Sequence, residues 1–159
     1  QAYLERLNNP TPWTRSVGPA LKDNNRTLSQ VIASEGKGIG AAILTIRISA
    51  AHNREKEFFS WVSGEIFPTL VSQPGIIAAH LMKGDHSASD TKTEEKAMRE
   101  KPDEIADWII FIEGIEVAPL DPLWNDGVFS ESTLIQHGAR AADMGTYRLH
   151  FALSSEDSE

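Results

Sequence analysis

The sequence contains no cysteine, and this absence excludes several kinds of chemistry. Without thiols the chain has no disulfide framework, no thiolate nucleophile and no cysteine metal site. It also lacks a Gly-x-Ser-x-Gly sequence, the turn that presents the nucleophile in many hydrolases. Basic residues are few, 15 against 23 acidic ones, which gives a formal net charge of -8. Because a surface of that sign repels phosphate backbones, we expect no nucleic-acid partner.

Long apolar runs are missing as well. The longest, such as residues 39–46, are too short to cross a bilayer, and no basic-then-apolar signal opens the chain. We therefore expect a cytoplasmic protein with no membrane partner. The first residue is Gln1, so we expect that the start is processed or that the chain is a fragment of something longer. No two histidines have a metal-type spacing, and we expect neither a metal nor a cofactor.

The 159 residues, 40% of them hydrophobic, suffice for one domain with a sizeable core. We expect this domain at residues 39–159. Residues 1–38 are less regular, with an apolar patch around residues 28–32 that fits a strand or a short helix. We interpret them as an N-terminal extension or the remnant of a preceding repeat. Residues 84–107 form a polar excursion, either a surface insertion or a mobile lid over a pocket.

The clearest pattern is a strand, a helix and a strand in residues 40–83. Residues 41–49 alternate and are rich in β-branched side chains, which predicts a strand. Residues 55–71 carry apolar residues at helical spacing, although Pro68 should kink the last turn or end the helix early. That apolar stripe consists of Phe59, Val62, Ile66 and Leu70, widened by Phe58 and Trp61. A Pro74-Gly75 turn then leads into a strand at residues 76–82.

The second half of the chain repeats this order less clearly. Residues 107–113 predict a strand, residues 123–135 an interrupted helix, and residues 146–153 a last strand. A β-α-β-β-α-β order predicts an α+β, ferredoxin-like sandwich with four antiparallel strands and both helices on one face. Right-handed crossovers place the last strand beside the first, the first beside the third, and the third beside the second.

The face of the sheet away from the helices is expected to be covered. The second and third strands carry apolar residues on both faces, which is typical of a sheet buried on both sides. A second sheet must therefore stack on it. We predict a homodimer, in which two sheets form a barrel.

Five polar side chains fall within the predicted strands. Alternation places them together on the face away from the helices, next to one another in the order Arg148 and His150, Arg47, Glu113, His80. A small charged cluster in an apolar cavity is the usual composition of a ligand pocket. The alternative is structural: Arg47 and Glu113 form an ion pair, and His150 lies in water at a strand edge.

The helix and its exit carry a resemblance to a known superfamily. Phe58-Phe59-Ser60-Trp61-Val62-Ser63-Gly64-Glu65-Ile66-Phe67-Pro68-Thr69-Leu70, followed by Gln73-Pro74-Gly75-Ile76, resembles the dimeric α+β-barrel superfamily, which includes antibiotic-biosynthesis-monooxygenase-like and EthD-like domains. The resemblance implies the barrel fold and a homodimer. EthD-like members often carry a His two residues before the Pro, where this chain has Ile66, so fold transfers better than function.

Two functions from different classes are compatible with these patterns. The first is a small-molecule-binding barrel, such as a cofactor-independent monooxygenase-like enzyme for an aromatic or polyketide-like substrate. In it, His80 or His150 is the general acid/base, Arg47 or Arg148 holds an anionic oxygen, and Glu113 and Trp61 contribute to ligand binding. The second is a non-catalytic dimeric module, in which the polar cluster only fixes register. Haem binding would need an axial His, for which His80 is the candidate.

Overall fold

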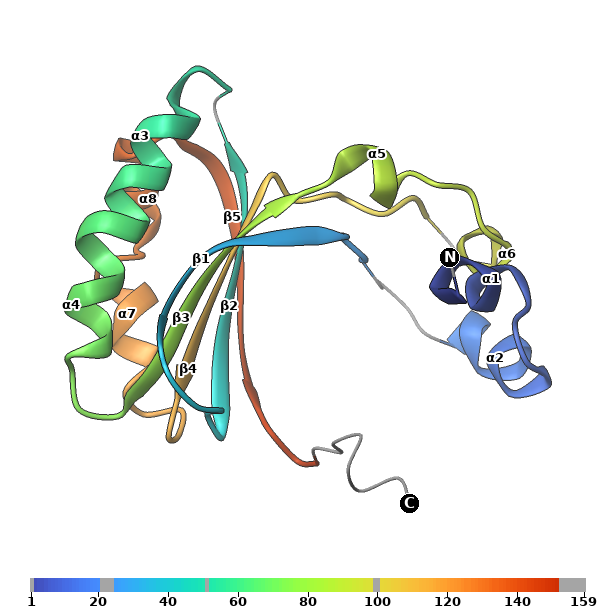
Figure 1. The fold of residues 1–159 in the computed structure, drawn as a ribbon, viewed down its shortest axis with the longest axis horizontal. Helices are drawn as coiled ribbons and strands as arrows, with labels where there is room; N and C mark the ends of the chain where they lie inside the picture. Colours follow the sequence, from blue (N-terminus) through green and yellow to red (C-terminus); the bar gives the residue numbers. More distant parts are fainter. Residues whose placement is uncertain (1, 21–24, 51, 99–100, 152–159) are drawn as a thin grey trace. The chain divides into compact units, whose positions relative to one another are not determined.

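The protein has an α+β fold built on one five-stranded sheet (Figure 1). The computed structural model describes residues 2–20, 25–50, 52–98 and 101–151. The sheet has the order β1-β3-β4-β2-β5, and β2 pairs antiparallel with both β4 and β5, as β3 does with β4. Its strands are β1 (Ser29–Gly36), β2 (Ala42–Ala50), β3 (Ile76–Gly84), β4 (Trp108–Gly114) and β5 (Ala139–Arg148).

The prediction of four strands is corrected by β1, a fifth strand at the edge beside β3. The order predicted for the other four strands is found, β5 beside β2, β2 beside β4, and β4 beside β3. Strand β1 is hard to recognise because most of it is exposed, and only Ile32 and Ala33 pack against the core. A strand with so little buried surface lacks the alternation that identifies a strand in a sequence.

The last strand begins seven residues earlier than predicted. We expected it at residues 146–153, but β5 covers Ala139–Arg148. The start of β5, residues 139–144, contains Ala, Arg and Asp and no β-branched residue, so its intrinsic preference for a strand is low. Pairing with β2 along the register Ala50↔Ala139 to Ala42↔Arg148 overrides that preference.

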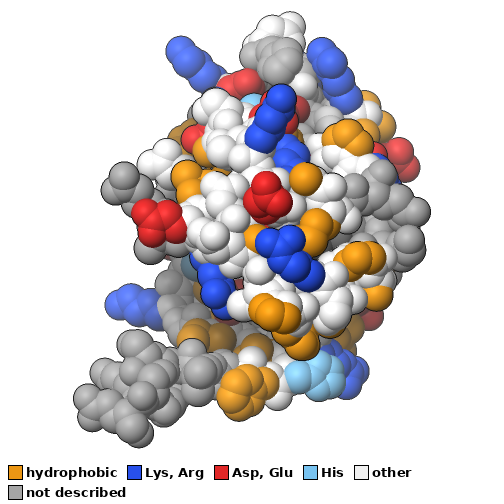
Figure 2. All heavy atoms as spheres, turned by 90° about the vertical axis from the view of Figure 1, so that its right-hand side faces the viewer, with side chains coloured by type: hydrophobic (Ala, Val, Ile, Leu, Met, Phe, Trp, Pro, Cys, Tyr) orange, Lys and Arg blue, Asp and Glu red, His pale blue; other side chains and the backbone are white. Residues whose placement is uncertain are grey.

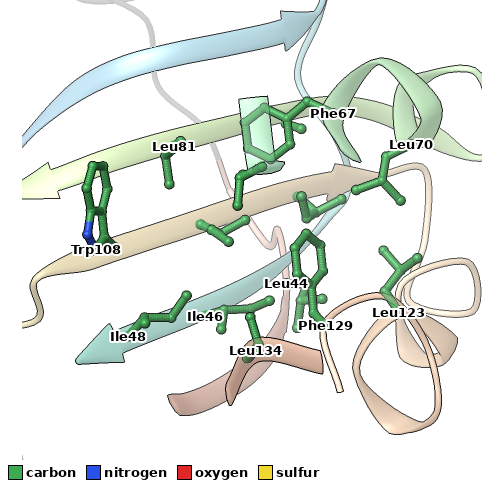
Figure 3. Packing of buried hydrophobic residues seen from close by; sticks show 14 of the residues in the cluster. Leu44, Ile46, Ile48, Phe67, Leu70, Leu81, Trp108, Leu123, Phe129 and Leu134 are labelled. Atoms are coloured by element: carbon green, nitrogen blue, oxygen red, sulfur yellow. The ribbon is translucent and has the colours of Figure 1, made fainter. Parts of the chain in front are cut away.

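Helices cover one face of the sheet (Figure 1). The predicted helix at residues 55–71 follows a 3₁₀ turn, η2 (His52–Arg54), and continues through three segments, α3 (Glu55–Ser60), η3 (Trp61–Ile66) and α4 (Phe67–Val71). On the same side lie α7 (Asp121–Asn125) and α8 (Glu131–Gln136). Figure 3 shows the core between these helices and the strands, formed around Leu44, Ile46, Ile48, Leu81, Trp108, Phe67, Leu70, Leu123, Phe129 and Leu134.

A π-helical segment lets the helix accommodate Pro68. In η3 the hydrogen bonds are one residue longer than in an α-helix, and the Phe67 N–H donates to the Val62 carbonyl. The extra residue rotates the part of the helix after it, so Val62 and Phe67, five positions apart, both point into the core. The predicted stripe is therefore shifted: Phe59 and Ile66 are only half-buried, while Phe58, Trp61 and Phe67 are buried. Pro68 does not end the helix, which continues to Val71.

The chain divides into two compact units. The sheet and its helices belong to a unit of residues 30–83 and 107–159. The other unit combines residues 1–29 with residues 84–106, so the segment predicted as an N-terminal extension contributes to both. This second unit contains α1 (Ala2–Asn8), α2 (Pro12–Val17), η1 (Gly18–Ala20), α5 (His86–Ser89) and α6 (Glu94–Ala97).

The smaller unit is held together by backbone and side-chain hydrogen bonds between its two segments. The Leu28 N–H donates to Ser89 Oγ at 2.8 Å, and the Leu28 carbonyl accepts from the Asp85 N–H at 2.8 Å. The Arg26 N–H donates to Asp103 Oδ1 at 2.9 Å. Ser89 is fully buried, so its hydroxyl joins the two segments away from water. Asp85, Ser89 and Asp103 of the excursion thus contact Arg26 and Leu28 of the N-terminal segment.

Two further features concern the side chains on the surface and the length and hydropathy of the helices. Figure 2 shows one face of the molecule, on which acidic, basic and apolar side chains are interspersed without a large region of one kind. Among helices built from the described residues, none combines the length and the hydropathy that a membrane crossing requires.

Two neighbouring residues of α8 test the core. Leu134 is 1% exposed in the core, whereas Ile135 is 50% exposed. Leu134→Ala should lower the free energy of unfolding by about 2–5 kcal/mol, because it leaves a cavity under the helix. Ile135→Ala is the matched control and should change it by about 0.5 kcal/mol or less. Urea denaturation measures both, and equal losses would contradict this assignment of the buried face.

Candidate functional site

The sheet has a second face, opposite the core, on which the candidate residues meet. Residues opposite each other on neighbouring strands share a face, so the register arranges this second face in cross-strand rows. The three rows, each read from β3 through β4 and β2 to β5, are Ala78, Glu113, Ile43 and Tyr147; His80, Phe111, Thr45 and Gly145; and Met82, Ile109, Arg47 and Asp143. The setting is mostly apolar: Ala78, Met82 and Ile109 are buried.

A β-bulge in β3 brings His80 to this face. Ile76 pairs with Gly114 while Ala78 pairs with Glu113, so β3 has one extra residue there, Ile77. Regular alternation would place Ile76 on the same face as His80, but Ile76 belongs to the core and the two residues lie on different faces. After the bulge, His80 stands one row from Glu113, within reach of a diagonal side-chain contact.

A chain of polar contacts runs through His80. Ser34 Oγ in β1 lies 2.9 Å from His80 Nδ1, and His80 Nε2 lies 3.4 Å from Glu113 Oε1. The other carboxylate oxygen, Oε2, accepts from the Gly40 N–H at 2.6 Å. A Cβ at position 40 would lie 2.7 Å from the Gly114 carbonyl oxygen and 2.9 Å from Glu113 Cβ, so only glycine lets its backbone come this close. His80 and Glu113, both predicted as site residues, are therefore brought together.

These contacts favour one tautomer of a neutral His80 ring. A carboxylate only accepts, so the tautomer with its hydrogen on Nε2 fits the contact with Glu113. In that tautomer the lone pair on Nδ1 faces the Ser34 hydroxyl, which is able to donate to it. Glu113 itself is oriented by the Gly40 N–H. The arrangement is a base held between a hydroxyl and a carboxylate.

An aromatic ring borders the same face on β5. The Tyr147 ring lies over Gly145, because a Cβ on Gly145 would be 2.6 Å from the Tyr147 hydroxyl oxygen and 2.9 Å from the ring. Thr45 Oγ1 donates to the Gly145 carbonyl at 3.2 Å and holds this part of β5 on β2. Tyr147 remains 59% exposed. Gly145, the last residue in the row of His80, is thus covered by the Tyr147 ring.

Arg47 lies on the same face but in another row. Its neighbours across the strands are Ile109 and Asp143, and Glu113 is four residues from Ile109 along β4. At a rise of about 3.3 Å per residue, the Glu113 backbone is about 13 Å farther along the strand. The register therefore does not place Arg47 and Glu113 opposite each other, as the predicted ion pair assumed. The nearest acidic residue by register is Asp143.

Arg148 and His150 are not part of the cluster. Arg148 pairs with Ala42, a core residue, so it belongs to the helix-covered face, and Tyr147 occupies the position predicted for it. Alternation places Arg148 with Ala142 and Met144, which pack against the core and lie before the predicted strand at residues 146–153. His150 comes after the end of β5 and is exposed. Neither side chain meets Arg47, Glu113 or His80 on the second face.

Trp61 lies on the core side of the sheet. It is 6% exposed and stacks on the His137 ring, with 3.8 Å between ring centroids and 4° between planes. Beside it, Arg54 binds Glu57, and this hydrogen bond, with smaller effects of the charges of Arg54 and His137, lowers the pKa of the Glu57 carboxyl. The sheet separates this group from His80, so Trp61 is a core residue and not a part of the candidate site.

A shallow groove of ≈ 420 Å³ also lies on the helix side. The Lys83 ammonium lies 2.8 Å from Glu55 and 5.5 Å from the centre of the Trp108 ring. Its charge therefore already interacts with a carboxylate and an aromatic ring of the same fold. The groove is lined by Glu55, Lys56, Phe59, Ser60, Lys83 and Trp108. Over the ranges that the structure describes, no group of three or more His, Asp or Glu side chains is placed to hold a metal ion.

Ser34 and Gly40 were missed by the sequence interpretation. Ser34 is 46 positions before His80, and Gly40 is 73 positions before Glu113, so their contacts depend on the pairing of strands and on the turn before β2. The apolar patch at residues 28–32 was the only available signal, because a strand there would continue to Ser34. Comparison with known proteins adds no candidate residue: no family model matches the chain, and no curated sequence matches it.

Glu113→Gln tests the orientation of His80. The Gln carbonyl should take the Gly40 N–H, which leaves its amide to donate to Nε2. The proton of neutral His80 should then move to Nδ1, which reverses the tautomer. Two-bond ¹H–¹⁵N NMR spectra distinguish the tautomers. Glu35→Gln, an exposed carboxylate next to Ser34 in the sequence, is the control. An unchanged tautomer in Glu113→Gln would show that Glu113 does not orient the ring.

Proposed function

We propose that the sheet unit binds a small aromatic or polyketide-like molecule on the second face of the sheet and exchanges a proton with it through His80, without a cofactor. The observation that carries this proposal is the chain from Ser34 through His80 to Glu113, set among apolar side chains. A neutral imidazole with an available lone pair is a general base, and the carboxylate behind it stabilises the imidazolium that forms.

The surroundings of His80 support an aromatic ligand. Its cross-strand neighbour is the half-buried Phe111, with Ala78 and Met82 two residues away on β3. Tyr147 borders the face at the far end and presents its ring over Gly145. Apolar walls with a few converging polar groups are typical of small-molecule sites. Arg47 in the adjacent row supplies the positive charge that an enolate or carboxylate oxygen on the ligand would approach.

A barrel made of two copies would enclose this face. Strands β5, β2, β4 and β3, with helices on one side, have the order of a ferredoxin-like sheet, to which β1 adds an edge strand. At the end of the first row Tyr147 is 59% exposed, and Leu149 and Phe151, which follow β5, are 51% and 77% exposed. An exposed apolar stripe of this kind marks an interaction surface. A second copy of the chain fits because the same stripe on both copies forms a self-complementary contact.

The alternative is a dimeric module without catalysis, which this exposed stripe favours equally. In it, the chain of polar contacts would only hold β1 on β3 and the turn at Gly40 on β4. The two functions differ in one property: the enzyme binds a ligand next to His80, and the module binds none.

Ligand-induced stabilisation separates the two. We expect one or more members of a panel of phenols, aromatic acids and polyketide-like lactones to raise the melting temperature. At about 100 times its Kd, a ligand adds about 2.7 kcal/mol of stability. Arg47→Ala and His80→Ala should remove the shift. Lys83→Ala, an exposed cation on the other face, should keep it. The shift remaining in both site variants would reject these site residues, and no shift in the native protein with any compound would favour the module.

The dimer is tested by sedimentation. A chain of 17.5 kDa should sediment as a dimer of twice that mass. Tyr147→Glu places a charge in the exposed stripe and should shift the protein toward monomer, because burying an unpaired charge opposes association. Ile135→Glu, also at an exposed apolar residue but on α8, is the control. A native protein that is monomeric at every concentration tested would overturn the barrel.

A further inference from the structure

The Ser34 hydroxyl lies next to His80, but proton exchange between His80 and a ligand does not require it. This hydroxyl is exposed on β1, at the edge of the sheet, and lies 2.9 Å from Nδ1 of a histidine whose other nitrogen faces a carboxylate. Nucleophilic serines in enzymes need this environment: a base within hydrogen-bond distance, and a third group that orients the base. Here the third group is Glu113, held by the Gly40 N–H.

We propose that Ser34 is a nucleophile, and that Ser34, His80 and Glu113 together form an acyl-transfer site for small aryl esters. The inference rests on the proposed role of His80 as a base. The two ring nitrogens exchange the roles they have in most serine hydrolases, with Nδ1 facing the hydroxyl and Nε2 facing the carboxylate. The chemistry is the same, because each nitrogen of imidazole is able to accept a proton while the other donates.

The position of Ser34 on a strand replaces the strand-to-helix turn that usually presents such a serine. A residue on an edge strand has open space beside it, and Ser34 is exposed while the side chain of His80 is 28% exposed. The incoming carbonyl carbon therefore reaches Oγ from solvent. The half-buried Phe111, beside His80, offers apolar surface for the aryl group of the ester.

The reaction balances without any further reactant except water. As the Ser34 Oγ forms a bond to the acyl carbon, its proton passes to His80 Nδ1, and the carbonyl electrons move to the oxygen. The tetrahedral intermediate then expels the aryloxide, which takes the proton from His80. Water then attacks the acyl carbon while His80 takes its proton; the bond between that carbon and Oγ breaks, and His80 returns the proton to Ser34 Oγ. Ester and water thus become a phenol and a carboxylic acid, and Ser34 is restored.

Glu113 acts on this reaction as a positioning residue. Its carboxylate keeps the hydrogen on Nε2 and the lone pair on Nδ1, so the base faces Ser34. Its negative charge also stabilises the imidazolium formed when Ser34 attacks. Loss of the carboxylate should therefore slow acylation and change its dependence on pH, while an effect on folding alone would leave that dependence unchanged.

Covalent labelling tests the proposal on the full chain. The native protein is incubated with p-nitrophenyl acetate and with an aryl fluorophosphonate, and the adduct is located by peptide mass spectrometry. The covalent product records each attack by Ser34 even where turnover is slow. We expect an adduct on Ser34, formed at a rate that depends on the His80 imidazole. His80→Ala should slow labelling by about 10²-fold or more, and Glu113→Gln should slow it and alter the pH profile.

The controls separate this inference from the proposed binding site. Ser34→Ala should lose the adduct, while Ser29→Ala, which removes another exposed serine of β1, should keep the native rate. Unfolding curves verify that each variant is folded. No adduct on Ser34, or equal labelling of Ser34 in His80→Ala, overturns the nucleophile. If aromatic ligands still raise the melting temperature in that event, the proposed binding function stands without it.

Discussion

The candidate site depends on one extra residue in β3. Between Ile76 and Ala78 the register with β4 shifts, so the strand contains a bulge at Ile77. A regular strand continuing from the Ile76↔Gly114 pair would place His80 opposite Ile110, on the core face. The bulge turns His80 to the second face, where Glu113 is its diagonal neighbour, and allows Ala79 and Leu81 to enter the core instead. Because side chains alternate with a period of two, a one-residue irregularity changes the face of everything after it.

The helix that covers the sheet contains a second irregularity of the same size. The π-helical segment η3 adds one residue to a turn before Pro68, and Phe67 and Leu70 reach the core after it. Without that residue, the apolar stripe would turn away from the sheet, and Ile66 would replace Phe67. The π-helical segment lies in the helix at residues 61–66, and the bulge lies in the strand that follows it, at residues 76–78. Together they set how the helix and this strand meet the core. Such irregularities often occur near functional sites.

Local patterns in the sequence predict the elements, but not the contacts that depend on these irregularities. The alternation of Leu44, Ile46 and Ile48 is continuous, and the strand and its buried face are found as predicted. The order of the four central strands follows from general rules of chain connection. Ser34 could not be assigned, because its partner is on another strand and β1 buries little. Arg148 was assigned to the wrong face, because the weak strand propensity of residues 139–144 concealed where β5 begins.

Strand β5 forms one edge of the sheet, so in the described part of the chain one side of its backbone has no neighbouring strand. An open edge of this kind is a template on which further chains add strand by strand, as in fibrils. Arg140, Asp143 and Arg148 place charges along this edge and are exposed. Charged side chains along an edge strand oppose its pairing with the edge of another chain. The charge pattern of β5 thus opposes open-ended polymers that would grow from this edge.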